Sequence, residues 1–176
     1  LAYSFSNSCG TSSDMKIFVV NDAPVVSINQ IGPYCANDSS FILDVGQPSG
    51  GVYQISNDTI GIFDPSLYNI GDVVLNYFFE DQNGCSNSTS RTISINDFPL
   101  VDAGIDVSIC SGDSLILNGS GALNYSWDNN VIDGFSFSPL QSGIYNVIGT
   151  DANGCENTDQ LEITIYQLPD VNLSPL

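Results

Sequence analysis

Residues 75–99 read LNYFFEDQNGCSNSTSRTISINDFP, and residues 145–169 read YNVIGTDANGCENTDQLEITIYQLP. Each stretch runs from an apolar segment through Asp-x-Asn-Gly-Cys into an alternating segment and then to Pro. Asn-Gly between such segments is a strong hairpin signal, because both residues tolerate positive φ. Residues 1–24, LAYSFSNSCGTSSDMKIFVVNDAP, align on a Cys and a Pro in the same way, so the pattern predicts three copies of one terminal hairpin.

The proline that closes each copy stands at positions 24, 99 and 169, at intervals of 75 and 70 residues. A second cysteine, Cys35 or Cys110, follows each of the first two prolines and precedes a short apolar run. The repeat predicts four segments: the last hairpin of one repeat (1–23), two complete repeats (24–97 and 98–168) and the start of a further repeat (169–176).

Short apolar runs with a period near two, separated by turn residues, predict strands throughout both complete repeats. The predicted strands are 25–28, 41–45, 51–55, 60–63, 73–79 and 92–95, and then 105–109, 115–118, 123–127, 131–137, 144–148 and 161–166. About seven short strands per repeat favour an all-β fold of tandem immunoglobulin-like β-sandwich repeats. Trp127 and Tyr145 then fall where such sandwiches bury a Trp and a Tyr, so we expect both in the core.

The chain has 2 basic and 20 acidic residues, a formal net charge of −18 and no His. Such a surface repels phosphate backbones, so nucleic acid is not expected as a partner. No run of 18 apolar residues occurs, so we expect no membrane insertion. Without His, a Cys nucleophile would lack the base that usually activates it, and general acid–base catalysis would lack its commonest residue. We therefore expect no enzymatic activity.

Several motifs resemble tandem repeats of very large secreted Bacteroidota proteins. In the first repeat they are Gly50-Gly51-Val52-Tyr53, Phe63-Asp64-Pro65, Leu75-Asn76-Tyr77 and Asn83-Gly84-Cys85. The second repeat is similar to PKD-like and Ig-like repeats in Ile109-Cys110-Ser111-Gly112, Tyr125-Ser126-Trp127, Gly143-Ile144-Tyr145 and Thr150-Asp151-Ala152-Asn153-Gly154-Cys155. The resemblance implies type IX secretion, an extracellular or outer-surface location, and a place in adhesins, including gliding-motility adhesins. It names no ligand.

The leading hypothesis is a structural and adhesive stalk that spaces a distal binding domain from the cell, with neighbouring repeats of the same polypeptide as its partners. One alternative is a module that binds surface glycans or other cell-surface proteins through exposed aromatic side chains. Candidates for such a platform, provided that their side chains are exposed, are Tyr34, Tyr53, Tyr68 and Phe135. Another alternative is a non-catalytic appendage of a secreted enzyme.

Five cysteines are disulfide candidates: Cys9, Cys35, Cys85, Cys110 and Cys155. Pairing within each repeat, Cys35–Cys85 and Cys110–Cys155, closes loops of similar length. However, the first turn and the final hairpin of an immunoglobulin-like sandwich lie at opposite ends, one strand length apart. A strand of 6–8 residues spans about 20–27 Å, whereas a disulfide needs Cα atoms within about 7 Å. This distance slightly favours Cys35–Cys155 between repeats, which leaves the other three cysteines to pair with repeats outside this chain. Free thiols are the third possibility.

No cofactor is expected, and calcium is the one candidate. Hard oxygen ligands lie at the predicted repeat junctions and hairpins, in Asp22, Asp81, Asp97, Asp102, Asp106 and Asp151. The alternative is that these residues only build turns. The resemblance also implies O-glycosylation where Asp precedes Ser or Thr and then a small or aliphatic residue, which Thr59 and Ser114 satisfy.

Overall fold

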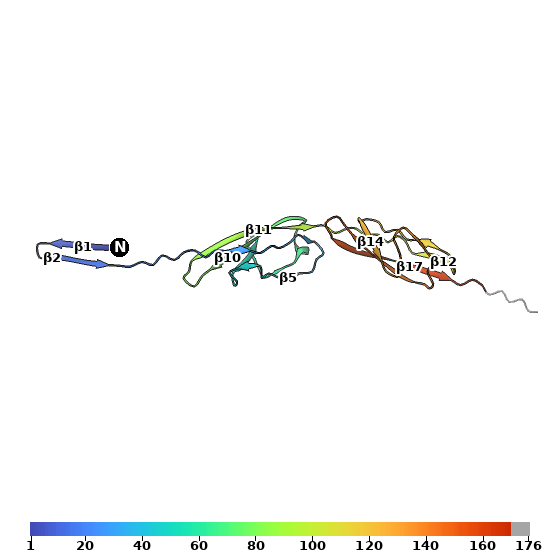
Figure 1. Ribbon diagram of the computed structural model, residues 1–176, viewed down its shortest axis with the longest axis horizontal. Helices are drawn as coiled ribbons and strands as arrows, with labels where there is room; N and C mark the ends of the chain where they lie inside the picture. Colours follow the sequence, from blue (N-terminus) through green and yellow to red (C-terminus); the bar gives the residue numbers. More distant parts are fainter. Residues whose placement is uncertain (170–176) are drawn as a thin grey trace, which may run out of the picture. The chain divides into compact units, whose positions relative to one another are not determined.

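The computed structural model describes residues 1–169, and nearly all of its regular structure is β-strand (Figure 1). The exception is a 3₁₀ turn over Pro65–Leu67. The predicted all-β class is therefore confirmed. The predicted start of a further repeat at 169–176 lies outside the described residues, apart from Pro169 itself.

The chain divides into two compact units. One unit holds Leu1–Ile31, Ile42–Phe63 and Val74–Thr92, and the other holds Gly32–Phe41, Asp64–Val73 and the chain from Ile93 onward. This division differs from the boundaries 24–97 and 98–168, which stay a prediction.

The strands of the first 96 residues are β1 (Ala2–Asn7), β2 (Gly10–Met15), β3 (Ser27–Ile28), β4 (Tyr34–Cys35), β5 (Phe41–Ile42), β6 (Gly46–Gln47), β7 (Val52–Ile55), β8 (Asp58–Ile60), β9 (Ile62–Phe63), β10 (Gly71–Glu80) and β11 (Ser86–Asn96). Strands β1 and β2 form a hairpin of their own, as the sequence predicts, and every residue from 1 to 23 is exposed. That this hairpin completes another repeat stays a prediction.

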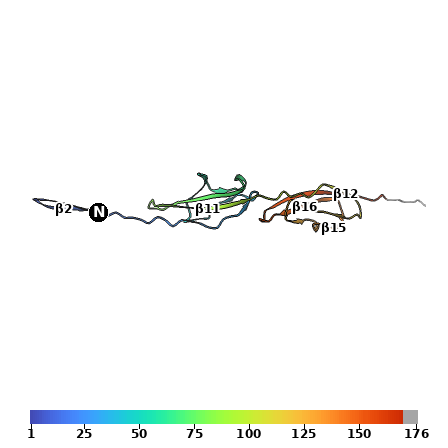
Figure 2. The same ribbon diagram turned by 90° about the horizontal axis from the view of Figure 1, so that it is seen from above.

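The strands that follow are β12 (Val107–Cys110), β13 (Leu115–Ile116), β14 (Asn124–Trp127), β15 (Ser136–Phe137), β16 (Gly143–Thr150) and β17 (Glu156–Tyr166). They form a four-stranded sheet in the order β12-β17-β16-β14 and a two-stranded sheet of β13 and β15. Figure 2 shows β12 and β16 in one layer and β15 in the other. The adjacency of β14, β16 and β17 matches strands C, F and G of an immunoglobulin sandwich, and the pair β13–β15 matches strands B and E.

The preceding strands repeat this order with one addition. A five-stranded sheet runs β4-β11-β10-β7-β8, and the short pairs β3–β6 and β5–β9 lie outside it. In both repeats the strand that carries the first cysteine is parallel to the last long strand: β4 to β11, and β12 to β17. The immunoglobulin-like architecture therefore follows from strand order, as the sequence predicts.

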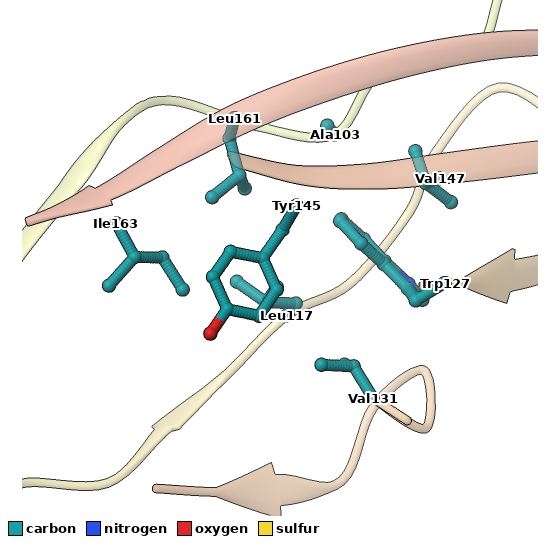
Figure 3. Close-up of a cluster of buried hydrophobic side chains, with 8 residues drawn as sticks. All are labelled: Ala103, Leu117, Trp127, Val131, Tyr145, Val147, Leu161 and Ile163. Atoms are coloured by element: carbon teal, nitrogen blue, oxygen red, sulfur yellow. The ribbon is translucent and has the colours of Figure 1, made fainter. Parts of the chain in front are cut away.

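The core of the second repeat forms around Trp127 and Tyr145, each 7% exposed, as the sequence predicts (Figure 3). Leu117 and Val131 face them from the opposite layer. The indole N–H of Trp127 donates to the Asp133 carboxylate at 2.8 Å, so the buried donor is satisfied.

Tyr53 and Tyr77 form the matching pair on β7 and β10, with ring centroids 4.7 Å apart. The Tyr53 hydroxyl accepts the N–H of Gly46 at 2.6 Å, and desolvation by burial raises the pKa of Tyr53. The Tyr77 hydroxyl donates to the Pro48 carbonyl and accepts the N–H of Gly51 at 2.7 Å. Tyr53 is only 8% exposed, so it does not meet the condition for an exposed aromatic platform.

Replacing Ile163 with Ala should lower the free energy of unfolding by about 2–5 kcal/mol, because Ile163 is 0% exposed and its loss opens a cavity in the Trp127 core. The matched variant Ile144→Ala, at a position 52% exposed, should cost only about 0.5 kcal/mol. Denaturant unfolding followed by Trp127 fluorescence measures both. Equal losses would show that β17 does not face the core as described.

Candidate functional site

Two kinds of cysteine-bearing turn occur, each of them twice. The Asp-x-Asn-Gly-Cys turns are residues 81–85 and 151–155, and they connect the two longest strands of each repeat. In the second turn the Asp151 carboxylate accepts the backbone N–H groups of Asn153 and Cys155, both at 2.8 Å. Gly154 has φ 84°, a conformation that a side chain would strain. The motif therefore builds a fixed turn that ends in cysteine.

The same bonds hold the turn at residues 81–85. The Asp81 carboxylate accepts the N–H groups of Asn83 and Cys85, both at 2.9 Å. The N–H of Cys85, with a smaller contribution from Asn83, holds the pKa of Asp81 below its ordinary value. A carboxylate is favoured here because its charged form accepts both bonds.

The Cys-x-x-Asp turns are residues 35–38 and 110–113. The Asp38 carboxylate accepts the N–H of Cys35 at 2.8 Å, and Asp113 accepts that of Cys110 at 3.0 Å. Each cysteine ends a strand beside the last residue of the long final strand: Cys35 pairs with Asn96, and Cys110 pairs with Tyr166. The chain thus carries two matched pairs of cysteine positions.

One member of each kind is joined in a disulfide between Cys35 and Cys155, with Cα atoms 5.6 Å apart and a sequence separation of 120. The Asn37 amide donates to the Glu156 carbonyl at 2.7 Å beside it. Both cysteines belong to the same compact unit. The structure therefore contains the pairing between repeats, whereas neither pairing within a repeat is present, and Cys9, Cys85 and Cys110 are free thiols.

Cys9 does not belong to either kind of turn. It precedes Gly10 in the β1–β2 turn, whereas Cys85 and Cys155 follow their glycines. The N–H of Cys9 donates to the side chain of Asn7, two residues earlier, at 2.9 Å. The N–H of Cys85 donates instead to Asp81, four residues earlier. The alignment of Cys9 with the other two hairpin cysteines is therefore wrong in its turn geometry.

The aspartates predicted as calcium ligands act mainly as backbone acceptors. Five of the six accept a backbone N–H: Asp81, Asp97, Asp102, Asp106 and Asp151. Asp22 is exposed. Within residues 1–169, no group of three or more His, Cys, Asp or Glu side chains is arranged to hold a metal ion. Calcium binding stays a prediction, and turn formation is the role that the contacts show.

The remaining predicted residues lie on the surface to different degrees. Phe135 is 67% exposed, while Tyr34 and Tyr68 are half-buried, and the Tyr34 ring packs 5.0 Å from that of Phe41. Thr59 and Ser114 are both exposed, so their hydroxyls are accessible for modification, which stays a prediction.

The surface beside β15 and β16 has an open hollow of about 340 Å³, lined by Asn129 and residues 137–145. None of the four predicted platform aromatics lines this hollow.

Neither a protein-family model nor a curated protein sequence matches the chain. Among solved structures, SGBP-B of the Bacteroides ovatus mixed-linkage glucan utilization locus, in complex with a mixed-linkage heptasaccharide, is 15% identical with a TM-score of 0.31. That match covers 82% of this chain and 48% of the other, so this chain spans about half of that protein. Protocadherin gamma C5 EC1-3 is 13% identical with a TM-score of 0.27, covering 79% and 67%. Likenesses this low say nothing of function.

Two further facts bear on where such a chain resides. A disulfide is typical of oxidising compartments outside the cytosol. In the described part of the chain, no helix is long and apolar enough to span a bilayer.

Replacing Asp81 with Ala should destabilise the chain at neutral pH, because the N–H groups of Asn83 and Cys85 lose their charged acceptor. The pKa of Asp81 is lowered by folding, so its contribution is complete above the unfolded value of about 3.9 and is lost as pH falls through the folded value. The stability difference between wild type and variant should therefore shrink below about pH 4.

Unfolding free energies of both proteins from pH 7 to pH 2 measure this difference. Asp58→Ala removes an exposed carboxylate on β8 and controls for net charge. A difference that stays constant over the whole pH range would contradict the role given to the Asp81 carboxylate.

Proposed function

We propose that the chain is a load-bearing stalk segment of a larger extracellular surface or secreted protein, with no catalytic role. The observation that carries the proposal is the Cys35–Cys155 disulfide, which joins the two predicted complete repeats. Its oxidised state supports an extracellular location. The resemblance to Bacteroidota adhesin repeats, with export by type IX secretion and gliding-motility adhesins as one setting, fits the same proposal.

The disulfide changes how the chain carries tension. Force applied along the chain passes from residue 35 to residue 155 through the sulfur atoms, because a covalent bond is the shortest connection between them. The 120 chain steps between the two cysteines are thereby removed from the path of the load. At about 3.4 Å per residue, roughly 400 Å of chain cannot be drawn out while the bond is intact.

The shielded segment contains most of the sheet structure. Strands β5 to β16 lie between the two cysteines in sequence, and so do six of the eight buried residues of the Trp127 core, the exceptions being Leu161 and Ile163 on β17. Loss of folded structure in this segment would therefore lengthen the chain very little. A spacer that must keep its length under load gains from such an arrangement.

Pulling single molecules by their two ends tests the proposal. The oxidised chain should release roughly 400 Å less contour length on complete unfolding than the reduced chain or the Cys155→Ser variant. Cys110→Ser, which removes a free thiol in the same repeat, should behave as wild type. Equal contour lengths for oxidised and reduced protein would contradict the proposal.

The competing proposal, a glycan-binding module, gives a different result in a separate assay. A stalk segment should give no signal on a glycan array. A signal that Phe135→Ala abolishes would favour a binding role through the exposed Phe135 ring and would count against a purely mechanical one.

A further inference from the structure

Cys85 lies in surroundings that repeat those of the bonded Cys155. The Cys85 thiol donates to the carbonyl of Asn21 at 3.8 Å. Asn21 stands three residues before Pro24, as Asn96 stands three residues before Pro99. Asn96 is the residue that pairs with Cys35 where β4 runs parallel to β11. The sulfur of Cys85 is thus next to the counterpart of the residue that positions Cys35.

A second contact, independent of the sulfur atoms, shows the same correspondence. The Asn87 amide donates to the Pro24 carbonyl at 2.9 Å, and the Asn157 amide donates to the Pro99 carbonyl at 3.0 Å. Both asparagines are the second residue after the turn cysteine. Each Asp-x-Asn-Gly-Cys turn therefore contacts the segment that leads into its own repeat in the same way.

The backbone at the two positions differs in one respect. The Asn96 carbonyl accepts the N–H of Ala36, the residue after Cys35, at 2.8 Å. The Asn21 carbonyl accepts the Cys85 thiol instead. A Cys-x-x-Asp strand that ran parallel to the chain at Asn21 would donate to this carbonyl and bring its cysteine next to Cys85.

We propose that Cys85 is one half of a second disulfide, whose partner is a Cys-x-x-Asp cysteine of another repeat of this type. Cys110 is the opposite half of such a bond, since it has the turn hydrogen bond and the parallel strand pairing of Cys35 and is an exposed free thiol. Cys9 is excluded because its turn has neither the Asp-x-Asn-Gly-Cys geometry nor the Cys-x-x-Asp geometry. The junctions before and after the two complete repeats would then each carry one disulfide, as the junction between them does.

The bond forms by thiol–disulfide exchange with a small disulfide oxidant such as oxidised glutathione. The partner cysteine attacks the oxidant, which releases one glutathione thiol and leaves a mixed disulfide. The Cys85 thiolate then attacks the protein sulfur of that mixed disulfide and releases the second glutathione thiol. Two protein thiols lose two electrons and two protons, and one glutathione disulfide is reduced to two thiols.

An insertion in the full chain tests the proposal. A second copy of residues 24–98, placed between Ala23 and Pro24, puts Asn96 of the inserted copy three residues before the original Pro24. The protein is folded in a glutathione redox buffer, its free thiols are alkylated, and its disulfides are mapped. The expected result is a bond between Cys35 of the inserted copy and the original Cys85, with the original Cys35–Cys155 bond as proof of folding.

The matched control is the same insertion with Cys35→Ser in the inserted copy only, in which the original Cys85 should be alkylated. An original Cys85 that stays free, or pairs elsewhere, while Cys35–Cys155 forms would overturn the proposal.

A second measurement needs no insertion. A peptide of residues 30–40 whose cysteine carries glutathione should react with Cys85 of the unmodified chain roughly tenfold faster, relative to Cys9, than glutathione disulfide does, because docking raises the effective concentration. The same Cys85-to-Cys9 ratio for both reagents would contradict specific docking.

Discussion

The covalent bond between Cys35 and Cys155 is the constraint to which the other features of the structure relate. A closed loop of this length removes about 5 kcal/mol of conformational entropy from the unfolded chain in the chain-entropy model. That amount is comparable to the whole stability of a small domain. The bond requires Cα atoms within about 7 Å, so both cysteines must be held accurately before they can join.

Aspartate side chains supply that accuracy. Asp38 and Asp151 each accept the N–H of the bonded cysteine, and Asp113 and Asp81 do the same for Cys110 and Cys85. Asp133 satisfies the buried Trp127 indole. Part of the net charge of −18 therefore consists of acceptors that define turns. A sequence with 20 acidic and only 2 basic residues suggests calcium binding from composition alone. The contacts show instead that the aspartates named above accept hydrogen bonds from N–H groups of the protein.

The periodic parts of the fold could be predicted from sequence, because a period-two apolar pattern reports burial directly. Trp127 and Tyr145 are in the core, and β16 lies where expected. The first half of β11 was missed because residues 86–91 are polar and only the paired neighbouring strand makes them extended. Strand β15 is shorter than predicted, because a turn at Asp133 and Gly134, with Gly134 at φ 74°, interrupts the predicted strand 131–137.

The candidate site was harder to predict because it depends on non-local pairing. Strand β4 has two residues, too few for any periodicity, and forms only against the far end of β11. The burial of Tyr53 is not evident from sequence, since nothing in its neighbouring sequence reveals its contacts with Tyr77 and Gly46. Strand length favours a disulfide between repeats only slightly, because the sequence around a turn cysteine does not indicate which other cysteine lies near it in space.

The account depends most directly on whether Cys35 and Cys155 are joined in solution. Lys16 and Arg91 are the two basic residues, so trypsin divides the denatured, thiol-blocked chain into residues 1–16, 17–91 and 92–176. Cys35 and Cys85 share the second fragment, and Cys110 and Cys155 share the third. The account predicts that fragments 17–91 and 92–176 run as one disulfide-linked species that separates on reduction. Three separate fragments before reduction, the result of bonds within repeats or of free thiols, would contradict it.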